Sequence, residues 1–418
     1  MSKKLLPVAL AALGMMVAMT AQAEGIEYHG YVRQQVGGTS KGGNLQCFNA
    51  ASPSGTKYRL GNECDNYAEA TIGLPFGDPN AVWFKHNLTV AMKDQGKQDY
   101  ESTGGSNPGF EVASRQNYLQ AGGFFEGDML QDSSLWVGKR FYNRHDIHMQ
   151  DFYYWGNSGP GAGIEGVKAG PAKLAYAYFQ NGGNANGPTD VVGKRYSLRF
   201  YDIDLAGGKL EGEAVALKGS TATGTDATGT GKILFLEHTQ NGVAGGFNKV
   251  ALVQGSGLGA NWDWVPTYQS TLATDENKSS TRIQDHLYFD IKGTRISGTA
   301  MAAYGKVTLG DHNANPGKTQ TWKSVGVRPQ YNFTNNFSVA VELGRNQMVT
   351  ETGATPQLTK LTIAPQLAMA PGVWARPVLR AFVTHAKWNA DAGTVANGVF
   401  GPNATSGTTY GLQGEVWW

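Results

Sequence analysis

Hydrophobic and polar residues alternate along most of this chain with a period of two. In residues 27–36, Glu27 and Arg33 lie on a mainly polar face, and the residues between the polar positions are mostly small or apolar; residues 67–72 and 197–205 alternate in the same way. A β-strand sends successive side chains to opposite faces, whereas an amphipathic helix repeats every 3.6 residues. The pattern therefore predicts an all-β protein whose strands each have one polar and one apolar face.

The connections between the predicted strands are of two kinds. Residues 206–209 and 333–337 are typical of tight hairpin turns. The other connections are long, polar and rich in glycine: 37–57, 94–115, 181–193, 218–231, 306–320 and 389–408. Short turns at one end of a sheet and long loops at the other are typical of a transmembrane antiparallel β-barrel. Charges on the polar face, such as Arg199 and Glu342, favour a water-filled lumen over a packed core.

The last residues, 410–418, alternate once more and finish on Trp418, which is expected of a strand that closes a barrel. Aromatic residues also stand near the predicted strand ends, where the two girdles of an outer-membrane barrel would lie. These residues are Tyr28, Tyr331, Phe333, Phe337, Trp388 and Trp418.

The first 23 residues have the features of a secretory signal peptide. Lys3 and Lys4 precede an apolar run, and Ala21-Gln22-Ala23 fits the small-x-small cleavage pattern. We expect a signal peptide over 1–23 and a single barrel over 24–418. No second long apolar run follows and the mean hydropathy is −0.35, which excludes a helical membrane protein.

The charge and the cysteines narrow the picture further. The chain has 35 Lys and Arg against 33 Asp and Glu, and loss of Lys3 and Lys4 would make it neutral, which argues against a nucleic-acid partner. Its two cysteines, Cys47 and Cys64, both lie in the exported part. In an oxidising compartment such a pair usually forms a disulfide, here within one loop; two buried free thiols are the alternative.

The stretch 139–163 concentrates candidate chemistry. It reads KRFYNRHDIHMQDFYYWGNSGPGAG, and His145 and His148 have the spacing that zinc sites use on helices. The neighbouring residues do not predict a helix, and no second His or Cys cluster appears, so we expect no metal site. A secreted glycoside hydrolase is another hypothesis, since it needs a carboxylate pair. Its candidates are Asp146 with Asp151, and Asp202 with Asp204.

Several segments resemble the maltoporins, the sugar-specific trimeric porins of Gram-negative outer membranes. They are YHGYVRQQVG, KYRLGNECDNYAE, WVGKRFYNRHDIHMQDFYYWGNSGPGAG, EHTQNGVAGGFNK, VWARP and the terminal EVWW, which occur in this order between residues 28 and 418. The resemblance is weakest in the long loops and in 180–230 and 255–320. It implies an 18-stranded barrel in outer-membrane lipid, assembled as a homotrimer. It also implies diffusion of maltose and maltodextrins, and of small solutes and ions, without catalysis or a cofactor.

The resemblance implies a row of six aromatic residues on which the apolar faces of the sugars stack, named here the aromatic slide: Tyr31, Tyr67, Tyr100, Phe247, Trp374 and Trp417. The alternation independently places Tyr31, Tyr67 and Trp417 on the polar face, whereas Phe247 and Trp374 depend on the resemblance. Tyr100 departs from the tryptophan that is more usual in the family, and lies on a loop that in the family reaches into a neighbouring subunit.

The resemblance also implies polar partners for sugar hydroxyls: Arg33, Glu69, Arg115, Arg144 and Asp151, with Tyr153 at the constriction opposite the slide. These charges could equally form a salt-bridge network that stiffens the barrel. A sucrose or other saccharide porin of the same family is an alternative. Retention of Arg144, Asp151 and Tyr153, and the absence of an extension before Tyr31, favour maltodextrins. The sequence does not answer whether a phage binds the loops.

Overall fold

The computed structural model describes residues 25–53, 56–104, 108–181, 192–220, 229–260, 277–311 and 313–418. The predicted signal peptide, residues 1–23, lies outside these ranges and stays a prediction. No helix in the described ranges has the length and apolar character needed to cross a membrane.

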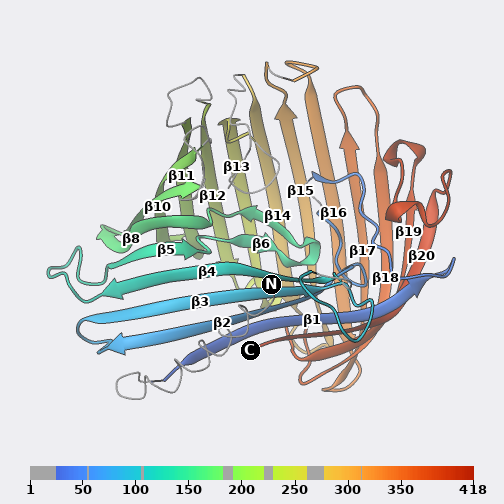
Figure 1. Ribbon diagram of the computed structural model, residues 1–418, viewed down its shortest axis with the longest axis horizontal. Helices are drawn as coiled ribbons and strands as arrows, with labels where there is room; N and C mark the ends of the chain where they lie inside the picture. Colours follow the sequence, from blue (N-terminus) through green and yellow to red (C-terminus); the bar gives the residue numbers. More distant parts are fainter. Residues whose placement is uncertain are drawn as a thin grey trace.

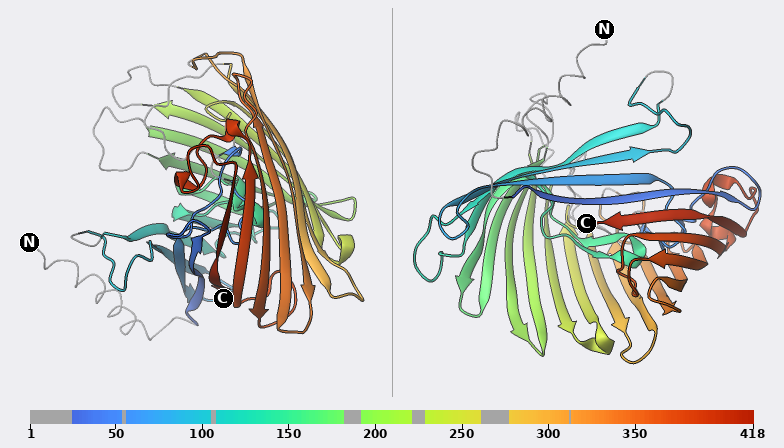
Figure 2. Two further views of the ribbon diagram at one scale, coloured as in Figure 1. Left: turned by 90° about the vertical axis from the view of Figure 1, so that its right-hand side faces the viewer. Right: turned by 90° about the horizontal axis from the view of Figure 1, so that it is seen from below.

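Eighteen antiparallel strands form one closed barrel, as the sequence predicted (Figures 1 and 2). Each strand pairs with its neighbours along the chain, and β1 pairs with β20, which closes the sheet. The barrel strands are β1 (Glu27–Thr39), β2 (Asn66–Gly77), β3 (Trp83–Asp94), β4 (Phe110–Gly122), β5 (Ser134–Arg140), β8 (Gly159–Ala169), β9 (Ala172–Asn181), β10 (Val192–Leu205), β11 (Gly208–Ser220), β12 (Thr230–Asn241), β13 (Phe247–Gly257), β14 (Ser279–Asp290), β15 (Ile296–Thr308), β16 (Thr319–Asn332), β17 (Phe337–Val349), β18 (Gln357–Ala368), β19 (Val378–Trp388) and β20 (Ser406–Trp417).

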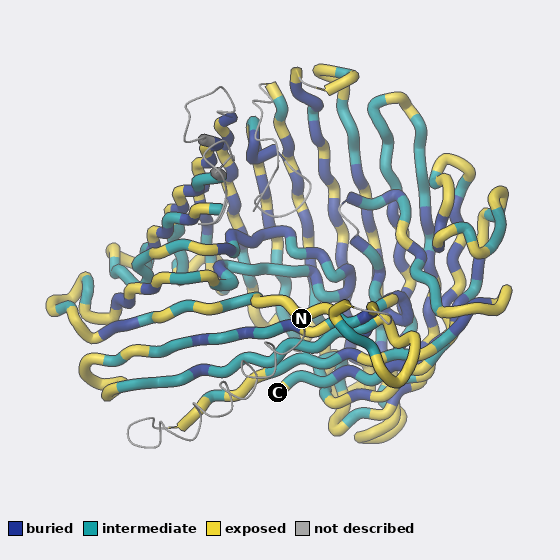
Figure 3. The backbone as a smooth tube through the Cα atoms, viewed as in Figure 1, coloured by how far each residue is buried: buried dark blue, intermediate teal, exposed yellow. Residues whose placement is uncertain are grey.

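Buried and exposed residues alternate along the strands, as Figure 3 shows most clearly on β12 to β18. In β12, Leu234 and Leu236 face outward and are exposed, while Phe235 and Glu237 face inward and are buried. Exposed leucine, isoleucine and valine side chains recur on the outer face of most strands. An apolar outer band is what contact with lipid requires of a barrel.

The connections alternate between short turns and long loops, and the predicted hairpins at 206–209 and 333–337 join β10 to β11 and β16 to β17. Several strands run further into the predicted loops than the sequence suggested. In particular β4 begins at Phe110, so the loop predicted over 94–115 ends before Arg115. The physical reason is that polar residues and glycines still form the backbone hydrogen bonds of a sheet when the neighbouring strand supplies the partners. Three-residue 3₁₀ turns occur at His148–Gln150 (η2), Val243–Gly245 (η3), Ala390–Ala392 (η4) and Ala396–Gly398 (η5).

One long connection, residues 141–158 between β5 and β8, folds into the barrel, and we name it the inner loop. It contains the small hairpin of β6 (His145–Ile147) and β7 (Phe152–Trp155), with β6 labelled inside the ring of strands in Figure 1. Its apolar side chains pack against the inner wall of the barrel. The cluster includes Ile147, Met149, Phe152, Tyr154 and Trp155 of the loop, and Val215, Ile233, Phe235, Met301 and Trp322 of the wall.

The inner wall of the barrel is therefore apolar where the inner loop packs against it. A loop that folds inward must bury its own apolar residues, and the wall supplies a matching apolar surface. The charged lumen predicted from Arg199 and Glu342 is present elsewhere: Arg199 pairs with Glu211, and Glu342 pairs with Arg328 and Lys360.

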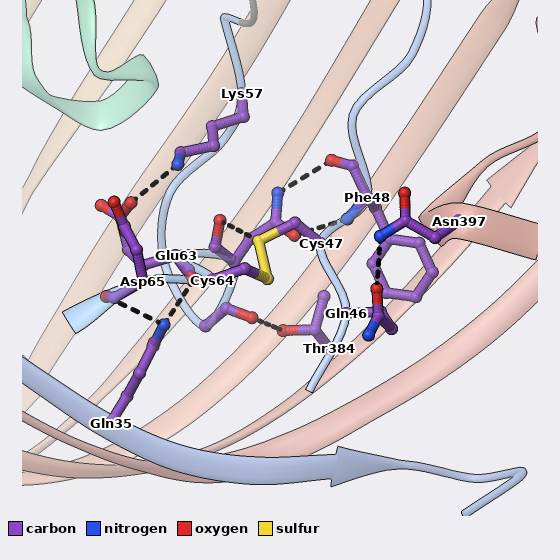
Figure 4. Close-up of a disulfide and its surroundings, with 12 residues drawn as sticks. Gln35, Gln46, Cys47, Phe48, Lys57, Glu63, Cys64, Asp65, Thr384 and Asn397 are labelled. Atoms are coloured by element: carbon purple, nitrogen blue, oxygen red, sulfur yellow. Dashed lines mark hydrogen bonds and ion pairs between the residues drawn. A yellow bond between two sulfur atoms is a disulfide. The ribbon is translucent and has the colours of Figure 1, made fainter. Parts of the chain in front are cut away.

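The loop between β1 and β2, residues 40–65, also turns into the barrel, and we name it the disulfide loop. Cys47 and Cys64 are bonded, which confirms the predicted disulfide and excludes the free thiols (Figure 4). The loop lies against other elements on both sides: Gln35 of β1 donates to the carbonyl of Glu63 at 2.5 Å, and Asn397 donates to Gln46 at 2.7 Å (Figure 4). The backbone N–H groups of Lys57 and Arg59 donate to the carbonyls of Gln150 and Met149 at 3.1 and 3.0 Å, so the end of the disulfide loop lies against the inner loop.

Candidate functional site

The inner loop is held to the barrel wall by two buried carboxylates. Glu213 of β11 accepts a hydrogen bond of 2.6 Å from the indole nitrogen of Trp155, and Glu237 of β12 accepts one from the hydroxyl of Tyr154. The Trp155 ring stacks on Phe235, with centroids 4.9 Å apart and planes within 3°. These contacts fix the loop across the lumen and set the position of the residues that narrow it.

The inner loop presents Arg144 between two aromatic rings. Its guanidinium carbon lies 4.0 Å from the ring centroid of Phe141 and 4.1 Å from that of Tyr153. Stacking on two faces holds the guanidinium plane while leaving donors at its edge. Burial raises the pKa of Tyr153, so its hydroxyl stays protonated. Two residues predicted from sequence, Arg144 and Tyr153, thus lie in contact on the inner loop.

The two acidic residues of the inner loop, Asp146 and Asp151, are both half-buried. Burial raises the pKa of the Asp146 carboxyl. Asp151 ends η2 with a left-handed backbone (φ 53°) and is partly exposed.

A second group of predicted residues lies on β2 and β4. Tyr67 donates a hydrogen bond to Glu69, and the Nε of Arg115 lies 3.5 Å from the same carboxylate. Arg115 is the extra residue at a bulge, since Thr89 pairs with Gln116 and Val90 with Ser114. A bulge re-aims the side chain of its extra residue. Arg115, which the sequence treated as a loop residue, is therefore a strand residue directed at Glu69.

The Tyr31 ring lies 6.2 Å from Tyr67 and is surrounded by charge. Its hydroxyl donates to Glu415 at 2.9 Å and accepts from Arg59 of the disulfide loop at 2.9 Å. Arg59 is largely buried. Although burial alone would lower its pKa, the carboxylates of Glu63 and Glu415 hold that pKa well above its usual value. The guanidinium is thus permanently charged beside the hydroxyl of Tyr31.

Arg33 is committed to the disulfide loop. It is only 6% exposed, its Nη1 lies 3.1 Å from Glu63, and its Nη2 bonds to Asp65. Glu63 also accepts from Lys57 at 2.9 Å and from Arg59 at 2.5 Å. Although burial opposes its charge, these three cations hold the pKa of Glu63 far below its usual value. This geometry corresponds to the salt-bridge role that the sequence left open.

Trp417 and Trp374 meet around His148 of the inner loop. The imidazole lies edge-on to both rings, with centroids 5.2 Å from Trp374 and 5.9 Å from Trp417. The Arg376 guanidinium carbon lies 3.9 Å from the ring centroid of Trp417 and covers one face of that ring. Burial, followed by the charge of Arg59, lowers the pKa of His148 well below its usual value, so the ring is neutral at pH 7.

Phe247, the first residue of β13, faces the lumen, and its ring contacts Tyr288 of β14 with centroids 5.6 Å apart. Tyr288 in turn contacts Trp374, which reaches over from the turn between β18 and β19, at 5.7 Å. Tyr100 is the exception among the six predicted slide residues: it lies on the β3–β4 loop and is 69% exposed in the single chain.

Sequence reasoning missed several residues of this site, among them Phe141, Arg59, Tyr288, Arg376 and Glu415. Strand alternation could have identified two of them, because Tyr288 follows Arg282, Gln284 and His286 on the inward face of β14, and Glu415 lies two residues before Trp417. Nothing in the local pattern identifies Phe141, Arg59 or Arg376, since their positions depend on how two loops and the β18–β19 turn fold.

The two histidines of the inner loop occupy different surroundings, so they do not form the pair that a zinc site would need. His145 lies between carboxylates, with its Nδ1 3.1 Å from Glu237 and its Nε2 3.7 Å from Glu211. Among the described residues, His145, Glu211 and Glu237 form the group of possible metal ligands whose donor atoms all lie within 4.8 Å of one another. Each carboxylate contacts a different nitrogen of the imidazole. Glu211 also pairs with Arg199, and Glu237 with Lys249, which is the geometry of an ion-pair cluster.

The carboxylate pairs proposed for a hydrolase are also distinguished by their surroundings. Asp202 and Asp204 both bind Lys209 beside the short turn that follows β10, at 2.9 and 2.7 Å. Both carboxylates are exposed there, away from the inner loop. Asp146 and Asp151 remain the pair that lies within the barrel.

The comparison that decides the family covers almost the whole chain. The sequence model of the LamB porin family matches residues 26–418. The chain belongs to the LamB porin family. This LamB porin is accordingly an outer-membrane β-barrel, and its eighteen-stranded fold is that of a channel.

Two solved outer-membrane structures are similar to this chain at low sequence identity. The structure of Pseudomonas aeruginosa OpdK with vanillate is 10% identical, with a TM-score of 0.51 over 95% of this chain and 100% of that one. Acinetobacter baumannii OccAB1 is 9% identical, with a TM-score of 0.49 over 96% of this chain and 99% of that one. At such low identity the likeness to OpdK extends to the barrel and not to what the lumen binds.

Proposed function

We propose that this LamB porin carries maltose and linear maltodextrins across the outer membrane by facilitated diffusion, and also passes small solutes and ions. The substrate has two kinds of surface: each pyranose ring has an apolar C–H face and a rim of hydroxyls. Aromatic rings stack on the face, while charged and hydroxyl groups exchange hydrogen bonds with the rim. Binding at a series of similar sites is favourable enough for the sugar to enter and weak enough for it to leave.

The observation that carries the proposal is the run of ring contacts that descends from the inner loop. Trp417, His148, Trp374, Tyr288 and Phe247 each lie within 6 Å of the next, measured between ring centroids. Such a run gives a sliding sugar a new stacking surface at each step. The aromatic slide is thus supported at Phe247, Trp374 and Trp417, and Tyr31 and Tyr67 extend it on β1 and β2.

The polar groups divide into two roles in this proposal. Arg144, Asp151 and Tyr153 on the inner loop, together with Glu69 and Arg115, exchange hydrogen bonds with sugar hydroxyls. Arg33 anchors the disulfide loop through Glu63 and Asp65. Tyr100 completes the slide only in an assembly of several subunits, because its ring is exposed in the single chain. We propose a homotrimer and removal of residues 1–23 on export.

Planar-bilayer conductance with titrated sugars tests the proposal. Maltohexaose should block the ion current in a saturable way, and more tightly than maltose or sucrose, because it spans more of the slide. Trp374→Ala should weaken the maltohexaose block by about tenfold, since an aromatic contact contributes ~0.5–1.5 kcal/mol beyond its buried area. The matched control is Tyr331→Ala, which removes an aromatic ring from the lipid-facing side and should leave the block unchanged.

Each rival function has its own outcome in the same experiments. Sucrose blocking more tightly than maltohexaose would favour a sucrose porin, and absence of a saturable block by any of the sugars would refute the slide. Incubation of the purified protein with maltohexaose tests the hydrolase hypothesis. Chain shortening that disappears in an Asp146→Asn or Asp151→Asn variant would show catalysis by that pair.

A further inference from the structure

The inward face of β14 carries an aromatic residue that was not among the six predicted positions. Arg282, Gln284 and His286 are buried on that face, and Tyr288 follows them as a partly exposed residue near the short-turn end of the barrel. The strand register sets Tyr288 directly across from Phe247. The tyrosine therefore lines the lumen at the level where a ligand would leave it.

Tyr288 joins two slide residues that come from separate parts of the chain. Its ring centroid lies 5.6 Å from Phe247, with planes at 41°, and 5.7 Å from Trp374, with planes at 59°. Phe247 belongs to β13, whereas Trp374 stands on the turn between β18 and β19. The three rings form a continuous aromatic surface across these elements. Among the described residues no hydrogen-bond partner of the Tyr288 hydroxyl is found, so its donor and acceptor are available to a ligand.

We propose that Tyr288 forms an additional glucosyl-binding subsite of this porin, between Trp374 and Phe247. The ring stacks on the apolar face of a pyranose that has passed Trp374, and the hydroxyl exchanges a hydrogen bond with the hydroxyl rim of the sugar. The inference rests on the proposed sugar-diffusion function and deepens it: it assigns the exit step to a residue of this chain. A sugar then meets no unlined stretch of wall between Trp374 and Phe247.

The test compares Tyr288→Ala, Tyr288→Leu and Tyr288→Phe in single channels of known orientation, with maltohexaose added to one side at a time. Loss of one stacking surface should weaken the block by about three- to tenfold in the Ala and Leu variants. Sugar added from the short-turn side should lose more of its association rate than sugar added from the loop side. The Phe variant should keep most of the affinity, and its shortfall measures the hydroxyl contribution.

A control variant, Phe289→Ala, and a reference variant, Trp374→Ala, separate the Tyr288 subsite from the aromatic slide as a whole. Phe289→Ala removes the neighbouring ring, which lies on the opposite face of β14, and should leave the block unchanged. If maltohexaose blocks the Tyr288 variants as tightly as the parent protein, while Trp374→Ala weakens the block, the subsite is refuted and the slide stands. If none of these variants changes the block, the slide itself is refuted. An equal loss in the Leu and Phe variants would also overturn the subsite, because it would show that ring stacking contributes nothing.

Discussion

Removal of the Trp155 side chain should loosen the inner loop and widen the constriction. The indole is fully buried, stacks on Phe235, and donates to Glu213. A large aromatic side chain buries ~150–250 Å², which at ~25 cal/mol per Å² corresponds to ~4–6 kcal/mol. Measured costs of replacing a buried aromatic residue by alanine are ~3–5 kcal/mol. Trp155→Ala should therefore shift the loop's docking equilibrium by about a thousandfold.

The barrel itself should survive this change, because Trp155 belongs to the separate β6–β7 hairpin and not to the 18-stranded sheet. The loop also keeps other anchors, such as the hydrogen bond from Tyr154 to Glu237 and the contact of Phe152 with Trp322. We therefore expect a folded channel whose loop leaves the wall repeatedly. Its open-channel current should be noisier and larger on average, and its maltohexaose block should be weaker, because Arg144 and Tyr153 no longer hold their positions.

Single-channel recording measures the current noise, the mean open-channel current and the maltohexaose block. The shift in gel mobility on heating verifies that the barrel has folded. Trp155→Phe is the matched control: it keeps the stacking on Phe235 and loses only the hydrogen bond to Glu213, so its current noise should lie between those of the parent and the alanine variant. A folded Trp155→Ala channel with unchanged conductance, noise and block would refute the idea that this stack holds the constriction.

Three further predictions concern the disulfide loop and its neighbours. Cations hold the pKa of Glu63 below its usual value, so its ion pairs should stabilise the disulfide loop above the ordinary carboxyl pKa of ~4.5 and lose this effect as the pH falls below that value. The maltohexaose block should therefore weaken on acidification in the parent, whereas Glu63→Gln should show a weaker block already at pH 7 and a flatter pH profile. A double Cys47→Ser, Cys64→Ser variant should lose ~3 kcal/mol of loop stabilisation and be cleaved faster by protease within residues 40–65, while its barrel keeps the same heat stability; equal cleavage rates would contradict this. His148→Gln should leave the pH profile of the block between pH 5.5 and 7.5 unchanged, because the low pKa of His148 keeps the imidazole neutral there; a step in the parent profile that vanishes in the variant would show that it titrates.

The inward positions of the slide residues on strands could be predicted because strand periodicity is a local property. Tyr31, Tyr67 and Trp417 alternate with apolar neighbours, so any antiparallel sheet with a lipid-facing side sends them inward. The same rule would have predicted Tyr288. It failed for Arg115, since the bulge at this residue arises from the pairing of β3 with β4 and leaves no mark on the periodicity of either strand.

Local sequence patterns were enough to predict four features: the all-β class, the face that each strand turns to lipid, the two lengths of connection and the cysteine pair. The tertiary structure alone decided that residues 141–158 and 40–65 fold into the barrel, and that Arg33 and Arg59 share Glu63. It also decided that Tyr288 joins Phe247 to Trp374. The reason is that strand faces follow from neighbours along the chain, whereas ion pairs and ring contacts within the lumen join residues up to several hundred positions apart, which meet only after the barrel has closed.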